Sequence, residues 1–475
     1  MKGDVSALYR ATQFLDTWLD YRYNRITIPG FVVTIAHEGE VVFQKACGYA
    51  NLERQVAMSA DHLFRVASHS KTFAATCVMQ LAEEKLLDID EPVANYVKWL
   101  ESHEDKRMSR ITARQLMCHS AGVIRDGKNA DYWQMLNSFP DQEEFKKQIL
   151  ETELVLQSNL KMKYSNYGYS LLGCLVEAVS GLPFNEYVQK QIIEPLKLKE
   201  TGPEFDERIL PFIVTGYSRR ESGKRLPLEE KTYTRAMSAA TGFYSNASDL
   251  CKYFHAQFVG SGKLLSDESK REMQRTQWRV QHSDNEEYGL GVDVEYNGDR
   301  RLFGHGGGFP GQRTKTCCDP EQRLIVVILT NCIDGESRNI SKGVLSVIDH
   351  FEKSGEAADP ETIDELRRFE GTFRSLWGDV SIVENGRKLI AVNPDGWFPF
   401  GHDAEPQILD YVDQSTLKVA RTNGYGNLGE LVHYDFEGDG KTKTIRYGGS
   451  QKWIDSEYQK VLETRINREA LASST

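Results

Sequence analysis

Ser68 and Lys71 have the residue types and the spacing that nucleophilic catalysis by a serine requires. They stand one helical turn apart at the start of a predicted helix, so their side chains share one face of it. A serine hydroxyl is a poor nucleophile at its free pKa, and a neutral or desolvated lysine amine beside it accepts its proton. The helix N-terminus also presents backbone N–H groups where an oxyanion would develop. The pair therefore predicts a serine nucleophile with a lysine activator.

The same spacing occurs at two more places in the chain, Ser158…Lys161 and Ser415…Lys418. By composition, about one or two such matches are expected by chance in a chain of this length. A capping serine beside a solvated lysine explains at least two of the three matches. The spacing alone therefore does not identify the nucleophile.

A second candidate group is Tyr164-Ser165-Asn166, on a predicted loop before a helix that begins near Gly168. A tyrosine with a lowered pKa serves as a general base, and an amide holds both a lysine and a substrate. The Tyr-x-Asn pattern is common, however, and also occurs at Tyr244-Ser245-Asn246 and Tyr425-Gly426-Asn427.

The third candidate is the run Gly304-His305-Gly306-Gly307-Gly308, on a predicted strand. Consecutive glycines let a ligand approach the backbone closely, and a backbone N–H there completes an oxyanion hole. A bulge or tight turn explains the glycines as well, and a lone histidine is more often a satisfied core residue.

The elements that must position these groups alternate along the chain. Strand patterns precede and follow a long block that is mostly helical in period, and a final helix is predicted over 338–354. This order predicts a mixed α/β domain whose sheet is built from both ends of the domain, with an all-helical insert between them. The predicted catalytic domain is 1–354, with sheet parts at about 1–65 and 230–354 and the insert at about 90–200.

The composition changes at 352–363, which is small, acidic and contains a proline, as is typical of a linker. Beyond it, short alternating stretches are broken by Gly, Asn and Asp about every ten residues. We therefore predict a small β-barrel or sandwich as a second domain over 365–475.

Length and composition exclude several classes of protein. A chain of 475 residues with 40% hydrophobic and 27% charged residues is a soluble globular protein of two or three domains. The formal charge of −11 disfavours nucleic acid as a partner. Apolar runs are too short to span a bilayer, and no signal peptide is visible, so we expect a cytoplasmic protein.

The eight cysteines form no C-x-x-C pair and have no histidine cluster beside them. Most lie in apolar periodic segments, where a reduced cysteine behaves as a small hydrophobe. We expect a reducing compartment, no structural metal and no cofactor.

The order of the three groups resembles the serine hydrolases of the penicillin-recognising type: class C β-lactamases, DD-peptidases, D-aminopeptidases and β-lactamase-like esterases. The flanks resemble this family too, over about residues 25–350. ITARQLMCHSAGV matches the family's T-x-x-x-L-x-x-H-x-S-G stretch, except that Ala121 stands where serine is usual. TGFYSNASDLCKYF resembles a structural segment, which explains Tyr244-Ser245-Asn246.

The resemblance implies the β-lactamase/transpeptidase-like fold, an α/β (α+β) arrangement of an antiparallel sheet with flanking helices and an all-helical subdomain. It also implies a role for each matched residue. Ser68 would be acylated, and Tyr164 would pass a proton to the leaving group; whether Lys71 or Tyr164 is the general base stays open. The other implied roles are Asn166 as holder of Lys71 and of a substrate carbonyl, Gly306 and Gly307 as substrate-binding residues, and the backbone N–H groups of Ser68 and Gly308 as the oxyanion hole.

His305 stands where β-lactamases usually carry the lysine of K-T-G. A histidine is mostly neutral at pH 7 and holds a substrate carboxylate more weakly than a lysine does. Efficient β-lactam hydrolysis is therefore not the first expectation.

The C-terminal region resembles the lipocalin-like barrel that some peptidases of this family append to gate the active site. An oligomerisation module or a stabilising cap explains it equally well. Its adjacent aromatic residues at 397–400 would either reach the catalytic cleft or form ordinary barrel core.

These observations favour a serine hydrolase that acts through a Ser68 acyl-enzyme on short peptides or amides, including substrates with D-residues. A carboxylesterase or weak β-lactamase of the same fold is the close alternative. A non-hydrolytic peptide-binding or sensor protein is the alternative of another class. The expected partner is a small molecule or short peptide, and a homo-oligomer is left open.

Overall fold

The computed structural model describes residues 5–228, 231–354, 366–386, 388–400, 406–424, 426–438 and 440–472. Two compact units share the chain: Thr27–Ser341, and Met1–Ile26 together with Lys342–Thr475. Most of the predicted linker at 352–363 lies outside the described residues.

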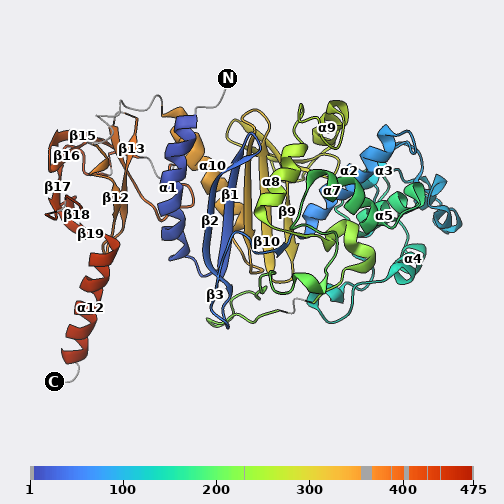
Figure 1. The fold of residues 1–475 in the computed structure, drawn as a ribbon, viewed down its shortest axis with the longest axis horizontal. Coiled ribbons are helices and arrows are strands. Elements are labelled where there is room, and N and C mark those ends of the chain that lie inside the picture. Colours follow the sequence, from blue (N-terminus) through green and yellow to red (C-terminus); the bar gives the residue numbers. More distant parts are fainter. Residues whose placement is uncertain are drawn as a thin grey trace. The chain divides into compact units, whose positions relative to one another are not determined.

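A nine-stranded antiparallel sheet forms the centre of the unit 27–341 (Figure 1). Its order is β3-β2-β1-β11-β10-β9-β8-β7-β6, so the first hairpin of the chain pairs with a strand from the far end of the unit. Phe31 lies opposite Thr330 in that pairing. The prediction of a sheet built from both ends is confirmed. The strands are β1 Gly30–His37, β2 Glu40–Asn51, β3 Val56–Ala57, β6 Trp278–Arg279, β7 Glu286–Tyr288, β8 Asp293–Asn297, β9 Arg300–Phe309, β10 Gln312–Asp319 and β11 Leu324–Thr330.

The central strands are buried because their sequences are nearly continuous apolar runs. Every residue of β11 is buried, as is every residue of β1 except His37. A strand of this kind is stable only where both faces of the sheet are covered. Helix α8 (Ala247–Ala256) packs against β1 and β11 within this unit.

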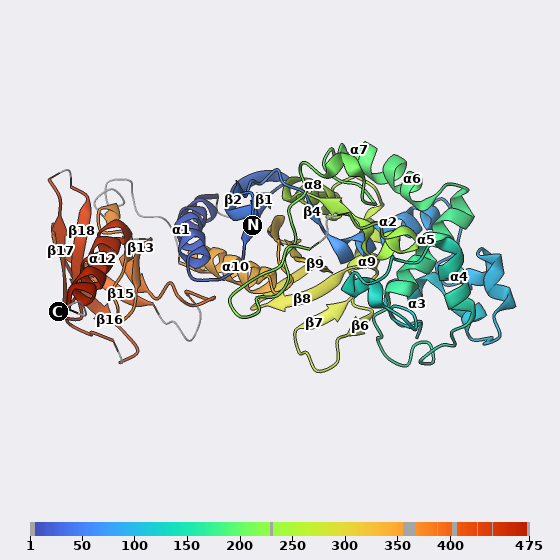
Figure 2. The same cartoon turned by 90° about the horizontal axis from the view of Figure 1, so that it is seen from below.

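The helices of this unit gather beside the sheet, around α2 (Ser70–Glu83) and α5 (Asn166–Ser180) (Figure 2). These two helices pack on each other and on the turn Ser238–Gly242. Ser165 caps α5, because its Oγ accepts the Gly168 N–H at 2.8 Å. The other helices of the group are α3 Ala113–Met117, α4 Gln142–Leu150, α6 Phe184–Val188, α7 Glu194–Leu196 and α9 Asp267–Gln274, and a short ladder joins β4 Phe64–Arg65 to β5 Tyr244–Ser245.

The other unit holds helix α1 (Val5–Tyr23), most of helix α10 (Ser337–Lys353) and an antiparallel eight-stranded sheet. A bridge between Arg374 and Trp453 joins its edges into a nearly closed barrel, which confirms the predicted barrel. Helix α12 (Asp455–Ala472) follows the last strand. The strands are β12 Gly371–Phe373, β13 Val380–Asn385, β14 Lys388–Val392, β15 Gln407–Asp413, β16 Thr416–Arg421, β17 Leu431–Phe436, β18 Thr442–Tyr447 and β19 Ser450–Trp453.

The aromatic segment 397–400 packs on helices of its own unit. The ring of Phe400 stacks on His350 of α10 at 3.9 Å between centroids and lies 5.1 Å from Phe14 of α1. The Arg22 guanidinium lies 4.1 Å from the Trp397 ring centroid, a cation–π contact. These aromatic residues therefore anchor the chain between β14 and β15 to α1 and α10.

Among the described residues, no helix is both long and apolar enough to cross a membrane. Within the same residues, no three or more His, Cys, Asp or Glu side chains are grouped so that they would hold a metal ion.

Candidate active site

Ser68 lies in a tight turn, Ala67–His69, that leads directly into helix α2. Ala67 has a φ of +49°, in the left-handed region that strains a residue with a side chain. The turn is held by Ser70, whose hydroxyl donates to the Ala67 carbonyl at 2.6 Å and accepts the Phe243 N–H at 3.1 Å. The sequence just before the helix thus places the Ser68 side chain at the edge of a cleft.

Lys71 is fully buried one turn further along α2. Its Nζ contacts three oxygens: Ser68 Oγ at 3.1 Å, Asn166 Oδ1 at 2.7 Å and the Ala240 carbonyl at 2.7 Å. Burial lowers the pKa of Lys71 to about 7, although the nearby Asp126 carboxylate opposes that shift. Near neutral pH the amine is therefore neutral in a large fraction of molecules, and a neutral amine is able to accept a proton.

Tyr164 contacts the nucleophile from the other side. Its hydroxyl lies 2.9 Å from Ser68 Oγ. Burial raises the pKa of Tyr164 above its usual value, although its hydrogen bond with Ser68 opposes this. A general base at this position would need a lowered tyrosine pKa, and desolvation shifts the pKa of Tyr164 in the opposite direction. The raised pKa keeps Tyr164 protonated at neutral pH, as a proton donor must be; which of Lys71 and Tyr164 is the general base stays a prediction.

Asn166, the first residue of α5, is oriented by Asp126. Its Nδ2 donates to Asp126 Oδ1 at 2.6 Å, so its Oδ1 must face Lys71. Asp126 also accepts the Trp133 indole N–H at 3.0 Å and pairs with Arg125 at 3.1 Å. The sequence analysis missed Asp126, because a single acidic residue in a long irregular segment carries no periodic signal.

His119, from the family-like stretch quoted above, supports Tyr164. The two rings lie 4.1 Å apart between centroids, and His119 Nδ1 accepts the Ser165 N–H at 3.1 Å. That acceptor role leaves the proton on Nε2, which is buried without a hydrogen-bond partner among the described residues. His119 therefore holds the Ser165 backbone N–H by a hydrogen bond and packs against the ring of the preceding residue, Tyr164.

The glycine run lies on β9 and forms one wall of the cleft. A Cβ atom on Gly307 would lie 2.2 Å from Thr314 Oγ1 and 2.3 Å from the Val66 carbonyl, so no side chain fits there. Gly308 lies opposite Arg313 of β10, and its Cβ would be 2.4 Å from the guanidinium. The close approach explains why this strand needs glycine; the oxyanion role of the Ser68 and Gly308 N–H groups stays a prediction.

His305 is buried beside this wall, and it is not among the described residues that line the cleft. Its Nδ1 lies 2.6 Å from the Gly306 carbonyl and its Nε2 lies 3.0 Å from the Tyr288 hydroxyl. Burial lowers its pKa, while the Asp293 carboxylate opposes the shift. A neutral ring that donates from Nδ1 and accepts at Nε2 satisfies both contacts. Because both ring nitrogens are engaged within the protein, a catalytic role of His305 stays a prediction.

The cleft has a volume of about 800 Å³ and carries more cations than carboxylates. Three of its cations have carboxylate partners: Arg125 with Asp126, Lys315 with Glu295 at 3.1 Å, and Arg338 with Glu286. Arg313 is exposed and forms no ion pair among the described residues; its Nε donates to the Ile333 carbonyl at 2.8 Å. Sequence analysis missed Arg313 because its orientation depends on strand pairing.

The competing sequence matches have structural roles. Ser158 donates to the Ala121 carbonyl at 2.9 Å, and Ser415 bonds to Asp413 within a turn. Asn246 caps α8 by accepting the Asp249 N–H at 2.9 Å, and Tyr244 belongs to β5. Tyr425 lies outside the described residues. The structure therefore brings together Ser68, Lys71, Tyr164 and Asn166, and no second group from these matches.

The unit 27–341 combines an antiparallel sheet with a group of helices, and Ser68 is hydrogen-bonded to Lys71 and Tyr164 between them. This arrangement defines a serine hydrolase with the β-lactamase and transpeptidase-like fold. The chain belongs to the β-lactamase family: the family model described as Beta-lactamase matches residues 15–343. Protein flp of Staphylococcus aureus (strain MW2) is 25% identical over 189 residues, or 40% of this chain and 38% of that protein. The chain thus matches well under two thirds of that curated relative's length.

Two solved structures share the fold. The octameric penicillin-binding protein homologue from Pyrococcus abyssi has a TM-score of 0.62 and 21% identity, and the match covers 94% of this chain and 99% of that chain. D-amino acid amidase from Ochrobactrum anthropi SV3, complexed with D-phenylalanine, has a TM-score of 0.60 and 23% identity, covering 72% of this chain and 98% of that one.

Proposed function

We propose that this protein hydrolyses amides or short peptides through an acyl-enzyme on Ser68. The observation that carries the proposal is the position of Ser68 Oγ, 3.1 Å from Lys71 Nζ and 2.9 Å from the Tyr164 hydroxyl. One neighbour is an amine with a pKa of about 7, and the other is a phenol that stays protonated. A base and an acid on one nucleophile are what acyl transfer needs.

Acylation begins when neutral Lys71 accepts the Ser68 proton. Oγ then bonds to the substrate carbonyl carbon, and the carbonyl oxygen takes the electron pair as an oxyanion. The N–H groups of Ser68 and Gly308 stabilise that charge in this proposal. Asn166 holds the Lys71 amine in place throughout, because its oxygen is only 2.7 Å from Nζ.

The tetrahedral intermediate collapses when the leaving amine receives a proton. Tyr164 donates its hydroxyl proton to that nitrogen and the C–N bond breaks. The Lys71 ammonium, which holds the former Ser68 proton, then gives that proton to the phenolate, so that both groups return to their starting states. A water molecule then hydrolyses the acyl-enzyme. Lys71 takes a proton from the water, and the water oxygen bonds to the acyl carbon. The bond from that carbon to Ser68 Oγ breaks, and Lys71 gives its proton to Oγ.

Amides are the preferred substrate class because an amine leaves only when protonated, and Tyr164 is a buried, protonated donor 2.9 Å from the nucleophile. The shared fold with D-amino acid amidase supports substrates that contain D-residues. The cleft cation Arg313, without an ion pair among the described residues, supports a substrate that carries a carboxylate. An ester is the second candidate, since the same acylation serves both and an alkoxide leaves more easily.

The setting of the enzyme is part of the proposal. All eight cysteines are free thiols, and all but Cys174 are buried, which supports a reducing compartment such as the cytoplasm. The shared fold with an octameric homologue over 94% of this chain supports a homo-oligomer. A gating role of the barrel stays a prediction.

The first test is intact-mass measurement after incubation with a fluorophosphonate probe. We expect one adduct on the wild type, mapped to Ser68 by peptide analysis, and none on Ser68→Ala. Ser158→Ala is the matched control, because it removes a serine with the same spacing and should keep the adduct. Turnover of D- and L-aminoacyl anilides then defines the substrate. An adduct that persists in Ser68→Ala refutes the proposal and favours the non-hydrolytic binding protein.

A further inference from the structure

One end of the C-terminal barrel contains a second cavity, of about 500 Å³. It lies where the loops that follow β12, β14, β16 and β18 meet, and it shares no lining residue with the cleft around Ser68. Its volume is within the ~300–1,000 Å³ usual for small-molecule sites. Nothing in the proposed hydrolysis uses it.

Trp377 stands at the rim of this cavity and is 97% exposed. Its neighbour Leu376 is 67% exposed. Indole is the largest apolar side chain, and leaving one wholly in water costs the free energy that its burial would contribute. A tryptophan in this position offers a flat apolar face to a ligand.

Four amide side chains line the cavity, and two of them, Gln407 and Asn427, pack closely over a glycine. A Cβ on Gly448 would lie 2.5 Å from Asn427 Nδ2, and one on Gly426 would lie 2.7 Å from Gln407 Nε2. The Tyr447 hydroxyl donates a hydrogen bond to Gln407 Oε1. This contact fixes the orientation of the amide, because the Gln407 NH₂ group must then point away from Tyr447. Planar amides held in this way present fixed donors and acceptors.

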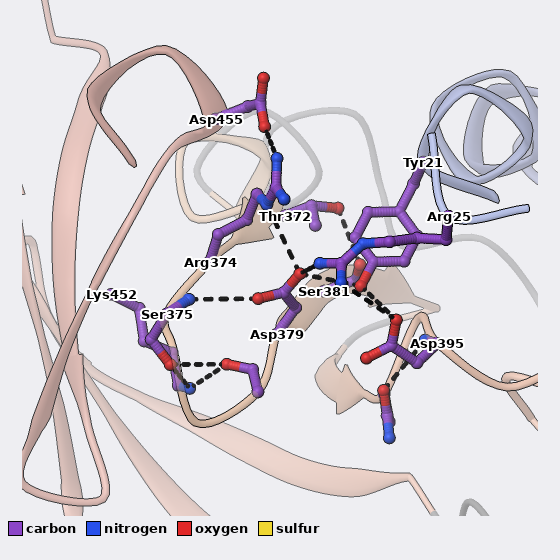
Figure 3. A network of polar contacts seen from close by, with 12 residues as sticks. Tyr21, Arg25, Thr372, Arg374, Ser375, Asp379, Ser381, Asp395, Lys452 and Asp455 are labelled. Atoms are coloured by element: carbon purple, nitrogen blue, oxygen red, sulfur yellow. Dashed lines mark hydrogen bonds and ion pairs between the residues drawn. The ribbon is translucent and has the colours of Figure 1, made fainter. Parts of the chain in front are cut away.

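The floor carries one carboxylate and one ammonium, so the charged lining residues sum to zero. The carboxylate is Asp379, which Figure 3 shows among Tyr21, Arg25 and Arg374. The Tyr21 hydroxyl donates to Asp379 Oδ2 at 2.8 Å. Lys452 Nζ donates to Ser375 Oγ at 3.0 Å and to the Gly378 carbonyl at 2.7 Å. The two charges are therefore engaged within the protein, and the floor offers little attraction to an ionic ligand.

We propose that this cavity binds a neutral saccharide. A sugar ring has one apolar C–H face, which stacks on an indole, and an edge of hydroxyls, each both donor and acceptor, which match amide groups. The polar wall excludes a purely apolar ligand. A peptide that binds by adding a strand needs an open edge, and the bridge between Arg374 and Trp453 closes the barrel.

Binding is tested on the full-length protein by titration calorimetry and saturation-transfer NMR. The probes are the trisaccharides of N-acetylglucosamine and of glucose, with tri-alanine as the peptide probe. We expect at least one trisaccharide to bind the wild type, and its affinity to fall at least ten-fold in Trp377→Ala and in Asn427→Ala. Tyr411→Ala is the matched control, since it removes an exposed barrel aromatic outside the cavity and should bind normally.

Three results would overturn the proposal: no binding of either trisaccharide, binding that both variants retain, or binding of tri-alanine alone that Trp377→Ala abolishes. The fluorophosphonate adduct at Ser68 is measured in parallel on each variant. It reports the catalytic site alone, so a failure of sugar binding is distinguishable from a failure of the proposed hydrolysis.

Discussion

Asp126 accepts the side-chain N–H of Asn166 at 2.6 Å, and this contact decides which end of the Asn166 amide faces Lys71. The amide oxygen then lies 2.7 Å from Nζ. If the amide were reversed, two donors would face each other and the lysine would lose an acceptor. A carboxylate that does not touch Ser68 therefore positions the base.

Asp126→Asn should lower kcat by roughly 10-fold or more, because an amide at this position no longer specifies the Asn166 orientation. The Asp126 charge also raises the pKa of Lys71, so its removal should move the acidic limb of the kcat/KM profile to lower pH. Asp131→Asn, outside the site, is the control. A lower rate with an unmoved limb would argue for a structural role only.

The pH profile of the wild type should report Lys71. Because the neutral amine is the active form and its pKa is about 7, kcat/KM should rise with pH and level off above that value. The raised pKa of Tyr164 predicts no falling limb in the neutral range, since the phenol keeps its proton. A stopped-flow or plate assay from pH 5 to 9 measures this, and a rate that does not change across pH 7 would contradict the assignment.

Tyr164→Phe should damage amide turnover more than turnover of an activated ester, by roughly 10-fold or more, because only the amine must be protonated to leave. Comparison of an anilide with a p-nitrophenyl ester of the same acyl group measures the difference. Tyr244→Phe is the matched control, as it changes the tyrosine of the other described Tyr-x-Asn match and should leave both rates alone. Equal losses on both substrates in Tyr164→Phe would refute the donor role.

Gly307→Ala should destabilise the protein by roughly 2–4 kcal/mol, because its Cβ would lie 2.2 Å from Thr314 Oγ1 and 2.3 Å from a backbone oxygen. Gly306→Ala is a control on the same strand, where the nearest atoms are 3.6 Å away and the unfolding free energy should hardly change. Chemical denaturation measures both. Equal stability of the two variants would contradict this prediction, because it would show that strand β9 shifts enough to accommodate the Cβ atom on residue 307.

Arg313→Gln should weaken substrates that carry a carboxylate, with KM rising roughly 10-fold, while their carboxamide counterparts keep their KM. An N-acetyl dipeptide with a free C-terminus and its C-terminal amide form one pair; a succinyl anilide and its succinamide form the other, with the charge on the acyl side. Arg279→Gln, on an exposed side chain outside the cleft, is the control. The same KM change for charged and neutral substrates would contradict the carboxylate role.

The sheet and the barrel were predictable because their signals are local. Alternating and apolar runs specify strands, and turn residues separate them, whatever the rest of the chain does. The direction of the Tyr164 pKa shift could not be predicted, because desolvation depends on what packs around the ring, which no local pattern contains. Asp126 was missed for the same reason: its importance arises from a contact with Asn166, 40 positions along the chain.

By itself, the sequence indicated the class of chemistry through the order and the flanks of its three groups, because the spacing of Ser68 and Lys71 also occurs elsewhere in the chain. These two residues then need only one turn of the chain to meet. The tertiary structure alone decided which contacts Tyr164 and Asn166 make with them, and whether His305 faces the cleft or the core. It also decided that Lys71 is buried with no ion pair to a carboxylate in the described part of the chain, and that Arg313 lines the cleft. The register of strand pairing sets the direction in which a side chain points, and burial sets the local dielectric around it. Register and burial both arise from contacts between residues far apart in sequence.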